Sequence, residues 1–336
     1  MSLISIVVPV YHNATSLPDL LNQFQALAHR NRADQFEFVF VDDGSRDDSF
    51  AVLEALAQTE SRVRIIKLSR NFGSNAAVLA GLSHATGDAV AAIAADLQDP
   101  PELIHEMLAK WREGNKVILA VREERDDPSL TSFMADTFYM LFRRFAIKTM
   151  PRRGFDFFLI DRQVCRLITG IQENNAYLMG LILWMGFDPA VLPYHRRARA
   201  PRYGRSMWTF AKKLKYFVDS FVAFSYLPIR VASILGFILS FLGIIYAVII
   251  LINRLFSGID VEGWSSMMVV LLIVSGAQMV MMGVLGEYLW RNLDETRKRP
   301  RFIIDRIVES QSEHNVEGEA AIGADPRESE PDSLRR

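Results

Sequence analysis

The sequence predicts an α/β domain with a mainly parallel sheet, followed by a hairpin of two membrane-spanning helices. Two observations carry this prediction. Short apolar runs alternate with helix-period stretches over the first 121 residues, and two long stretches almost without charge follow residue 228. Half of the 336 residues are hydrophobic, and the excess is concentrated between Ile229 and Leu289.

Five segments predict strands because they are short, apolar and bounded by turn residues. These segments are Leu3–Val10, Phe36–Val41, Val63–Leu68, Ala89–Ala95 and Lys116–Val121. Apolar residues at helical spacing lie between them, in Ser16–His29, Asp47–Gln58, Asn75–Ala85 and Pro101–Glu113. Strands that alternate with helices predict a mainly parallel sheet covered on both faces. Ligands of such sheets bind beyond the carboxyl ends of the strands.

Two later segments are long and apolar enough to cross a bilayer. Ile229–Ile252 contains only Arg230, at its very start, and Trp264–Leu289 contains only Glu287, close to its end. Each exceeds the roughly 20 residues that a spanning helix needs. Basic residues precede the first segment and follow the second, whereas the connecting loop has only Arg254 beside two acidic residues. By the positive-inside rule we expect a multi-pass membrane protein with both termini in the cytoplasm.

Two further segments predict amphipathic helices at the membrane surface. Ser129–Lys148 carries a stripe of leucine and phenylalanine, and Met207–Tyr226 sets an apolar stripe opposite Lys212 and Lys213. An ordinary core helix would explain either pattern. The second segment runs directly into a predicted span, which favours an interfacial position.

These segments divide the chain into six parts. We expect an α/β domain over residues 1–206, including the surface helix at 129–148, and a juxtamembrane helix at 207–228. Spans at 229–252 and 264–289 follow, and then a cytoplasmic segment at 290–308 with a short strand near its end. Residues 309–336 are acidic and predict a disordered tail.

Charge and cysteine content exclude several classes of protein. The net charge is −1, and basic runs such as Arg196-Arg197 lack the aromatic residues of RNA-binding motifs, so we expect no nucleic-acid partner. Membrane surface or phosphate groups fit these runs better. Cys165 is the only cysteine, which excludes an intramolecular disulfide and a cysteine-rich zinc site.

Polar residues follow two predicted strands at the edge where a ligand would lie. Asp42 and Asp43 end the second strand; a turn and a helix cap explain Asp43 and its successors, but not Asp42. Asp96 and Gln98 follow the fourth strand, and their oxygens can reach one point if the chain is extended. Such oxygens suit Mg²⁺ or Mn²⁺, which commonly bridge to substrate phosphates. A helix start capped by Asp99 also explains this segment, and both interpretations can hold together.

Six motifs in order along the chain resemble those of the polyprenyl-phosphate glycosyltransferases, which include the dolichyl-phosphate mannose synthases and the bactoprenol glucosyltransferases. The motifs are Val8–Tyr11, Asp42–Ser45, Arg70–Gly73, Asp96–Pro100, Gly154–Phe157 and Arg202–Ser206. The resemblance covers roughly residues 3–305, and the two C-terminal spans are similar to those of the bactoprenol branch. It implies a GT-A fold, in which a Rossmann-like domain binds a nucleotide sugar.

The resemblance also implies roles for single residues. The loop from Pro9 to Tyr11, with Asp42 and Asp43, would cradle the nucleotide sugar, and Asp96 and Gln98 would hold Mg²⁺ or Mn²⁺ on its diphosphate. Asp156 matches the base that deprotonates or orients the acceptor phosphate. Phosphate contacts are expected from Arg122, Arg125, Arg202, Arg205 and Ser206.

Simpler interpretations stand beside these roles. Asp156 could be a structural aspartate between aromatic residues, and Arg122 and Arg125 could be solvated charges before a helix. The chain also departs from many relatives, which carry a further aspartate where Ala94 stands. The metal shell therefore has fewer protein carboxylates, and metal affinity or choice can differ.

The implied reaction is an inverting transfer of a hexose from a nucleotide diphosphate to a polyprenyl phosphate at the cytoplasmic membrane face. Glucose from UDP-glucose and undecaprenyl phosphate are the first expectation; mannose from GDP-mannose, N-acetylglucosamine and an aminosugar remain open. A processive synthase is disfavoured because the chain has no Gln-x-x-Arg-Trp motif. A non-catalytic scaffold that binds a nucleotide sugar is the alternative from another class. A homo-oligomer would follow if the C-terminal strand added to a neighbour's sheet.

Overall fold

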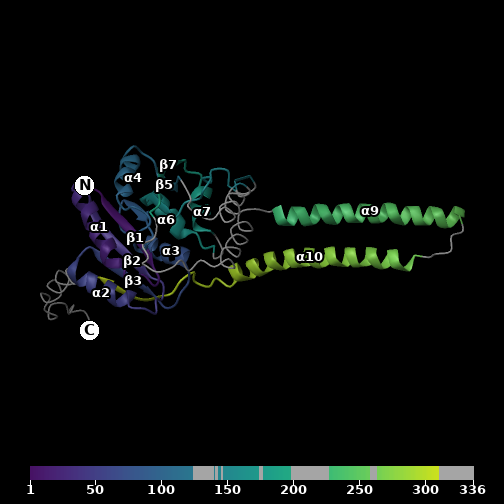
Figure 1. Ribbon diagram of the computed structural model, residues 1–336, viewed down its shortest axis with the longest axis horizontal. Helices are drawn as coiled ribbons and strands as arrows, with labels where there is room; N and C mark the ends of the chain where they lie inside the picture. The colour runs from purple at the N-terminus through teal and green to yellow at the C-terminus, as the bar shows by residue number, and fades with distance from the viewer. Residues whose placement is uncertain are drawn as a thin grey trace, which may run out of the picture.

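The computed structural model describes residues 1–123, 140, 143–144, 147–173, 177–197, 227–257 and 263–309. The strands are β1 Leu3–Val10, β2 Gln35–Asp42, β3 Val63–Leu68, β4 Ala89–Ala92, β5 Val117–Arg122, β6 Phe157–Asp161, β7 Pro189–Tyr194 and β8 Ile304–Glu309. The helices are α1 Leu17–Arg30, α2 Ser49–Thr59, α3 Ser74–His84, α4 Leu103–Arg112, α6 Arg162–Gly170, α7 Leu178–Trp184, α9 Leu227–Ser257 and α10 Trp264–Thr296. The strands form one mixed sheet in the order β7-β5-β6-β4-β1-β2-β3-β8 (Figure 1).

The directions of the strands decide where ligands can bind. β1 runs parallel to β2 and β4, β2 runs parallel to β3, and β5 runs parallel to β7. β6 lies antiparallel between β4 and β5, and β8 lies antiparallel to β3. The carboxyl ends of the six co-directional strands therefore share one edge of the sheet with the start of β6. The prediction of a mainly parallel sheet is confirmed.

Helices cover both faces of the sheet, as predicted, because side chains alternate along each strand. Ile6 and Phe38 belong to a core that includes Phe24 of α1 and buried residues of α2 and α4. Val7 and Val39 point the other way, into a core with buried residues of α3, α6 and α7. Phe24 stacks on Phe38 with ring centroids 5.4 Å apart, which fixes α1 against the sheet.

The predicted elements of the first 121 residues are all present, with small shifts at their ends. β4 ends at Ala92 rather than Ala95, and the backbone oxygen of Ala95 accepts a hydrogen bond from the Ser16 hydroxyl, 2.7 Å away. α1 begins at Leu17, and the Ser16 side chain at the N-cap position makes no capping hydrogen bond to the helix. Four elements after residue 150 have no counterpart in the prediction, namely β6, α6, α7 and β7.

The two apolar segments form helices α9 and α10, which lie side by side as a hairpin that projects from the α/β domain (Figure 1). By length and composition, Ile229–Ile250 and Ser266–Thr296 could each cross a membrane. Their large apolar side chains are exposed, among them Phe237 at 74% and Val280 at 68%, which suits contact with lipid. Glu287 is paired with Arg291, one helical turn away, at 2.9 Å.

The C-terminal strand pairs within its own chain. β8 returns from α10 to the edge of the sheet and hydrogen-bonds to β3, with Ile66 opposite Ile307. β8 thus occupies the edge of its own sheet beside β3, and the homo-oligomer stays a prediction. Most of the predicted surface helix 129–148, most of the juxtamembrane helix 207–228 and the tail after residue 309 lie outside the described residues.

Candidate active site

The candidate site is built from the ends of neighbouring strands at one edge of the sheet. Arg122 and Tyr194 are the last residues of β5 and β7 and lie opposite each other in the ladder. Asp156 directly precedes β6, whose reversed direction brings it to the same edge. Asp96 follows β4, and Asp42 ends β2. The sheet order thus places Arg122, Asp156 and Tyr194 in one half of the site, and Asp42 and Asp96 in the other.

The loop after β1 is tied to the loop after β2. The backbone N–H of His12 donates to the Ser45 hydroxyl at 3.1 Å, and the His12 Nε2 accepts from the backbone N–H of Arg46 at 3.3 Å. The rings of Tyr11 and His12 stack with centroids 4.3 Å apart. His12 therefore joins the two loops that were expected to cradle the nucleotide.

Asp43 fixes a third loop against this pair. Its carboxylate accepts hydrogen bonds from the backbone N–H groups of Phe72 at 2.7 Å and Gly73 at 2.9 Å. Burial raises the pKa of Asp43 to about 6, even though these two hydrogen bonds oppose the shift. Gly44 comes so close to this loop that a Cβ there would lie 2.5 Å from the carbonyl carbon of Arg70. The Arg70–Gly73 motif thus serves to hold the Asp42–Ser45 motif.

Asp42 differs from Asp43 because only one of its two carboxylate oxygens accepts a hydrogen bond from the described residues. Its Oδ1 accepts from the backbone N–H of Ser45 at 3.2 Å, whereas Oδ2 is buried without a hydrogen-bond partner among the described residues. A buried unpaired acceptor costs free energy unless a ligand satisfies it. Asp42 is therefore the better placed of the two aspartates to contact a ligand.

Asp96 and Gln98 lie on a tight turn, not on an extended chain as expected. Leu97 between them has a φ of +59°, in the left-handed region, and the N–H of Gln98 donates back to Asp96 Oδ1 at 3.2 Å. The Gln98 side-chain amide donates to the backbone oxygen of Arg197 at 3.2 Å, and the backbone N–H of Arg197 donates to the backbone oxygen of Gln98 at 2.9 Å. This turn is therefore pinned to the segment that follows β7.

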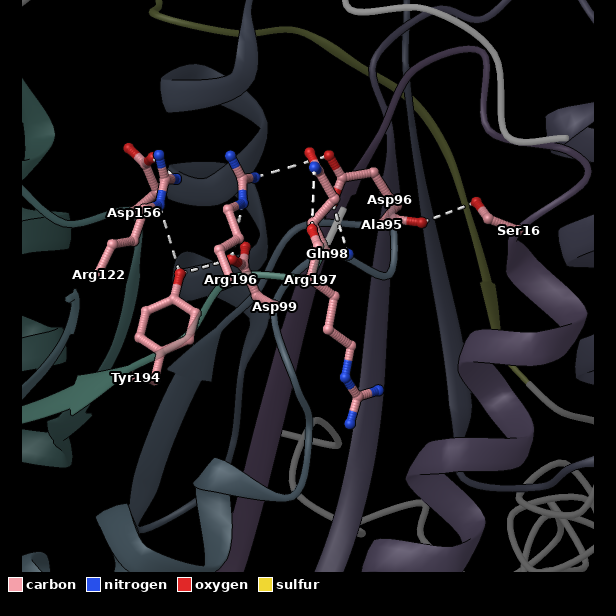
Figure 2. A network of polar contacts seen from close by, with 10 residues as sticks. All are labelled: Ser16, Ala95, Asp96, Gln98, Asp99, Arg122, Asp156, Tyr194, Arg196 and Arg197. Atoms are coloured by element: carbon pink, nitrogen blue, oxygen red, sulfur yellow. Dashed lines mark hydrogen bonds and ion pairs between the residues drawn. The ribbon is translucent and has the colours of Figure 1, made fainter. Parts of the chain in front are cut away.

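Asp99 contacts other side chains and is not the helix cap that the sequence predicts. It does not cap α4, whose N-cap is Glu102 without a side-chain hydrogen bond. Its Oδ1 accepts from the Tyr194 hydroxyl at 2.5 Å and from Arg196 Nε at 3.1 Å (Figure 2). Asp99 is only 1% exposed, and burial raises its pKa, against the effect of Arg196.

Arg122 connects this cluster to Asp156. Its Nη2 lies 2.6 Å from Asp156 Oδ2, and its Nε lies 3.5 Å from the Tyr194 hydroxyl oxygen (Figure 2). Burial lowers the pKa of Arg122 and the nearby Asp156 carboxylate raises it, with a net rise, so the guanidinium stays charged. The two residues form a charged pair where a phosphate could bind.

Comparisons with known proteins decide the family. Residues 5–172 match glycosyl transferase family 2, and the chain aligns over 90% of its length with relatives that are more than 30% identical. The chain belongs to glycosyl transferase family 2. It is thus a glycosyltransferase with a GT-A fold, and this part of the prediction is confirmed.

Several relatives of the enzyme are similar along nearly their whole length. An uncharacterized glycosyltransferase of Bacillus subtilis is 37% identical over 305 residues, which cover 93% of its length. A prophage bactoprenol glucosyl transferase homolog of Escherichia coli is 33% identical and covered to 99%, and the bactoprenol glucosyl transferase of Shigella phage SfX is 34% identical and covered to 98%.

Solved structures resemble the glycosyltransferase more distantly. A mannosyltransferase from Pyrobaculum calidifontis, in complex with GDP-Man and Mn²⁺, is 18% identical with a TM-score of 0.43, over 60% of this chain and 58% of that one. Mannosyl-3-phosphoglycerate synthase from Rubrobacter xylanophilus is 18% identical with a TM-score of 0.46, over 65% and 71%.

The residues at the β4 edge of the glycosyltransferase fit a hard divalent cation by their chemistry. Asp96 and Gln98 present a carboxylate and an amide from one turn, and oxygen atoms are the donors that Mg²⁺ and Mn²⁺ prefer. Within the described part of the chain, no three histidine, cysteine, aspartate or glutamate side chains gather at one point.

The structure tests the position of most predicted site residues, though not their roles. It brings Pro9, Tyr11, Asp42, Asp43, Asp96, Gln98, Arg122 and Asp156 to one edge of the sheet. Arg125, Arg202, Arg205 and Ser206 lie outside the described residues. The sequence analysis did not identify Tyr194 and Arg196. Both contact Asp99, which lies 95 and 97 residues earlier in the chain, so no local sequence pattern predicts these contacts.

Proposed function

We propose that this glycosyltransferase moves glucose from UDP-glucose to undecaprenyl phosphate at the cytoplasmic face of the membrane. The observation that carries the proposal is the full-length similarity to relatives named bactoprenol glucosyl transferases, which extends through both apolar helices. A shared catalytic domain alone would leave the acceptor open, because many chemistries use one fold. Two apolar helices attached to that domain suit an acceptor that resides in the bilayer.

The proposed topology follows from charge and hydrophobicity. Helices α9 and α10 would cross the membrane as a hairpin, with the α/β domain and β8 on the cytoplasmic side. Arg297, Lys298 and Arg299 follow α10 directly, and the positive-inside rule puts such residues in the cytoplasm. A nucleotide sugar from the cytosol and a lipid phosphate from the bilayer would then meet at the same end of the hairpin.

The two halves of the site are proposed to bind the two substrates. Asp42 and the Pro9–Tyr11 loop, supported by Asp43, would hold the nucleotide. The pair of Arg122 and Asp156 would receive the acceptor phosphate, with Arg125, Arg202, Arg205 and Ser206 as further phosphate contacts. Two observations support this division: Asp42 Oδ2 has no hydrogen-bond partner in the part of the chain that the structure describes, and the charged Arg122 side chain is largely buried.

The proposed reaction is a direct displacement. An oxygen of the acceptor phosphate attacks the anomeric carbon, the bond from that carbon to the diphosphate breaks, and the nucleoside diphosphate leaves with the electron pair. The anomeric centre inverts, so an α-linked donor gives a β-linked product. Because the acceptor phosphate is already ionised near neutral pH, Asp156 would orient it more than deprotonate it.

A divalent cation held by Asp96 and Gln98 would stabilise the negative charge that develops on the leaving diphosphate. These residues would position the diphosphate, and the Tyr194–Asp99–Arg196 cluster would keep their turn in place. Arg122 would supply positive charge on the acceptor side of the same centre.

The test is product formation by the full-length protein in detergent. The protein is incubated with undecaprenyl phosphate, Mg²⁺ or Mn²⁺ and, separately, UDP-glucose, GDP-mannose and UDP-N-acetylglucosamine, and mass spectrometry follows the lipid. We expect a hexosyl phospholipid from UDP-glucose only with the cation, and loss of it in Asp96→Ala and Asp156→Asn. Product from another donor would correct the sugar. Nucleotide binding without lipid product from any donor would reject the acceptor and favour the scaffold.

A further inference from the structure

One guanidinium faces two buried carboxylates beside the candidate metal site. Arg196 Nε lies 3.1 Å from Asp99 Oδ1, and its Nη2 lies 3.7 Å from Asp96 Oδ2 (Figure 2). Asp99 is 1% exposed and Asp96 is 7% exposed. Both carboxylates face the same guanidinium, so the positive charge of Arg196 offsets the repulsion between their negative charges.

The two contacts of Arg196 differ in strength. The contact with Asp99 is a hydrogen bond within normal limits, and the Tyr194 hydroxyl holds the same Asp99 oxygen. The contact with Asp96 is an ion pair at a distance too long for a hydrogen bond. Arg196 is therefore anchored to Asp99 and only faces Asp96, which leaves the Asp96 carboxylate able to change partner while the guanidinium stays in place.

We propose that Arg196 controls the affinity of Asp96 for a divalent cation, as a built-in counter-ion that opposes cation binding until a diphosphate arrives. This inference rests on the proposed function, in which Asp96 is a metal ligand. Without nucleotide, a cation at Asp96 is repelled by the guanidinium a few ångströms away. With a nucleoside diphosphate bound, the negative phosphate oxygens attract both positive charges, so the cation and the nucleotide strengthen each other's binding.

A purely structural role of Arg196 makes a different prediction. If Arg196 only supported Asp99 and Tyr194, its loss would lower stability and loosen the turn that carries Asp96. Cation affinity would then fall or stay unchanged. The sign of the change in affinity therefore separates the two roles.

The experiment measures Mn²⁺ binding to the full-length protein in detergent without nucleotide, from the electron paramagnetic resonance signal of free Mn²⁺. We expect Arg196→Gln to bind Mn²⁺ about tenfold more tightly than the wild type, and Arg196→Lys, which keeps the charge, to bind within about threefold of it. Arg197→Gln is the matched control, since Arg197 is the neighbouring residue and pairs with the exposed Glu102. Asp96→Asn identifies the binding event that belongs to this site. If Arg196→Gln has a much lower melting temperature than the wild type, Arg196→Met serves as a second variant that removes the positive charge.

The same titrations are repeated with UDP. We expect UDP to strengthen Mn²⁺ binding by a smaller factor in Arg196→Gln than in the wild type. The inference is overturned if Arg196→Gln and Arg196→Met bind Mn²⁺ no more tightly than the wild type, if Arg197→Gln has the same effect, or if no binding is sensitive to Asp96→Asn. These titrations need neither sugar nor lipid acceptor. The role of Arg196 can therefore be confirmed even if the transferase assay yields no product, and it can be overturned even if the transferase assay yields product.

Discussion

Arg122 and Asp156 form a hydrogen-bonded ion pair across neighbouring antiparallel strands, with Nη2 2.6 Å from Oδ2. The two partners are unequally exposed: the Arg122 side chain is 15% exposed and the Asp156 side chain is 62% exposed. Arg122 is thus fixed inside the site, and Asp156 reaches toward solvent from it. An incoming phosphate would meet both groups, with one attracting it and the other setting its orientation.

The first prediction concerns the charge of Asp156. Asp156→Asn keeps the size of the side chain but weakens the pair with Arg122, so the acceptor is held without its orienting carboxylate. We expect kcat for transfer to fall about 100-fold, in the range usual when a reactant loses the group that orients it, while UDP affinity changes less than threefold. The measurement is steady-state transfer kinetics together with UDP titration. Asp305→Asn, a change on the exposed side of β8, is the control and should keep wild-type kinetics.

The second prediction concerns the Tyr194 hydroxyl, which donates to Asp99 and accepts from Arg122. Tyr194→Phe removes both contacts and leaves a buried carboxylate with fewer donors. We expect a loss of about 1–2 kcal/mol in stability, seen as a lower melting temperature, and a several-fold lower kcat through misplacement of Arg122. Combining it with Asp99→Asn tests the cause. If the two changes act through one hydrogen bond, their effects will not add; full additivity would mean that Tyr194 acts elsewhere.

The donor half of the site could be predicted from the sequence, and the acceptor half only in part. Asp42 and Asp96 follow strands that alternate regularly with helices, so their common edge follows from the rules of parallel sheets. β6 has only five residues, of which the first four are apolar without alternation. β7 contains Pro189 and Pro193, which are tolerated because β7 is the outermost strand. Neither gives a clear strand signal. The position of Asp156 came from the resemblance, and the strand reversal that explains it came from the structure.

The third prediction uses two glycines with similar backbones and different surroundings. Gly44 has a φ of +66° and lies against the Arg70 carbonyl carbon, whereas Gly114 has a φ of +98° and no atom within 4 Å of a built Cβ. Gly114→Ala should cost only the backbone strain, about 1 kcal/mol. Gly44→Ala adds a clash with backbone, so we expect a larger drop in melting temperature and weaker UDP binding. Equal effects of the two changes would show that the contact between the two loops is unimportant.

The fourth prediction is a pH dependence that arises from Asp43. Its pKa is about 6 in the folded protein because of burial, against an ordinary value of 3.8. As pH rises from about 4 to 6, the unfolded chain releases this proton and the folded protein keeps it. The contribution of Asp43 to stability is therefore full at the lower pH and is lost as pH rises through 6. The melting temperature of the wild type relative to Asp43→Asn should fall between pH 4.5 and 6.5. A constant or rising difference would contradict the assignment.

The fifth prediction concerns the return of the chain to the sheet through β8. Val308 packs partly buried against the core of α1 and α2, whereas its neighbour Ile307 is 42% exposed. Val308→Asp places a charge against apolar side chains and should detach β8 from β3, because burying an unpaired carboxylate costs more than this short strand can offset. Ile307→Asp makes the same chemical change on the exposed face and is the matched control. We expect limited proteolysis to remove the C-terminal segment of Val308→Asp early and that of Ile307→Asp at the wild-type rate.

Since the segment from Arg301 to β8 also links α10 to the α/β domain, detachment of β8 should lower transfer to the lipid acceptor more than it lowers UDP binding. Equal proteolysis of both variants would mean that β8 is held by its backbone hydrogen bonds alone.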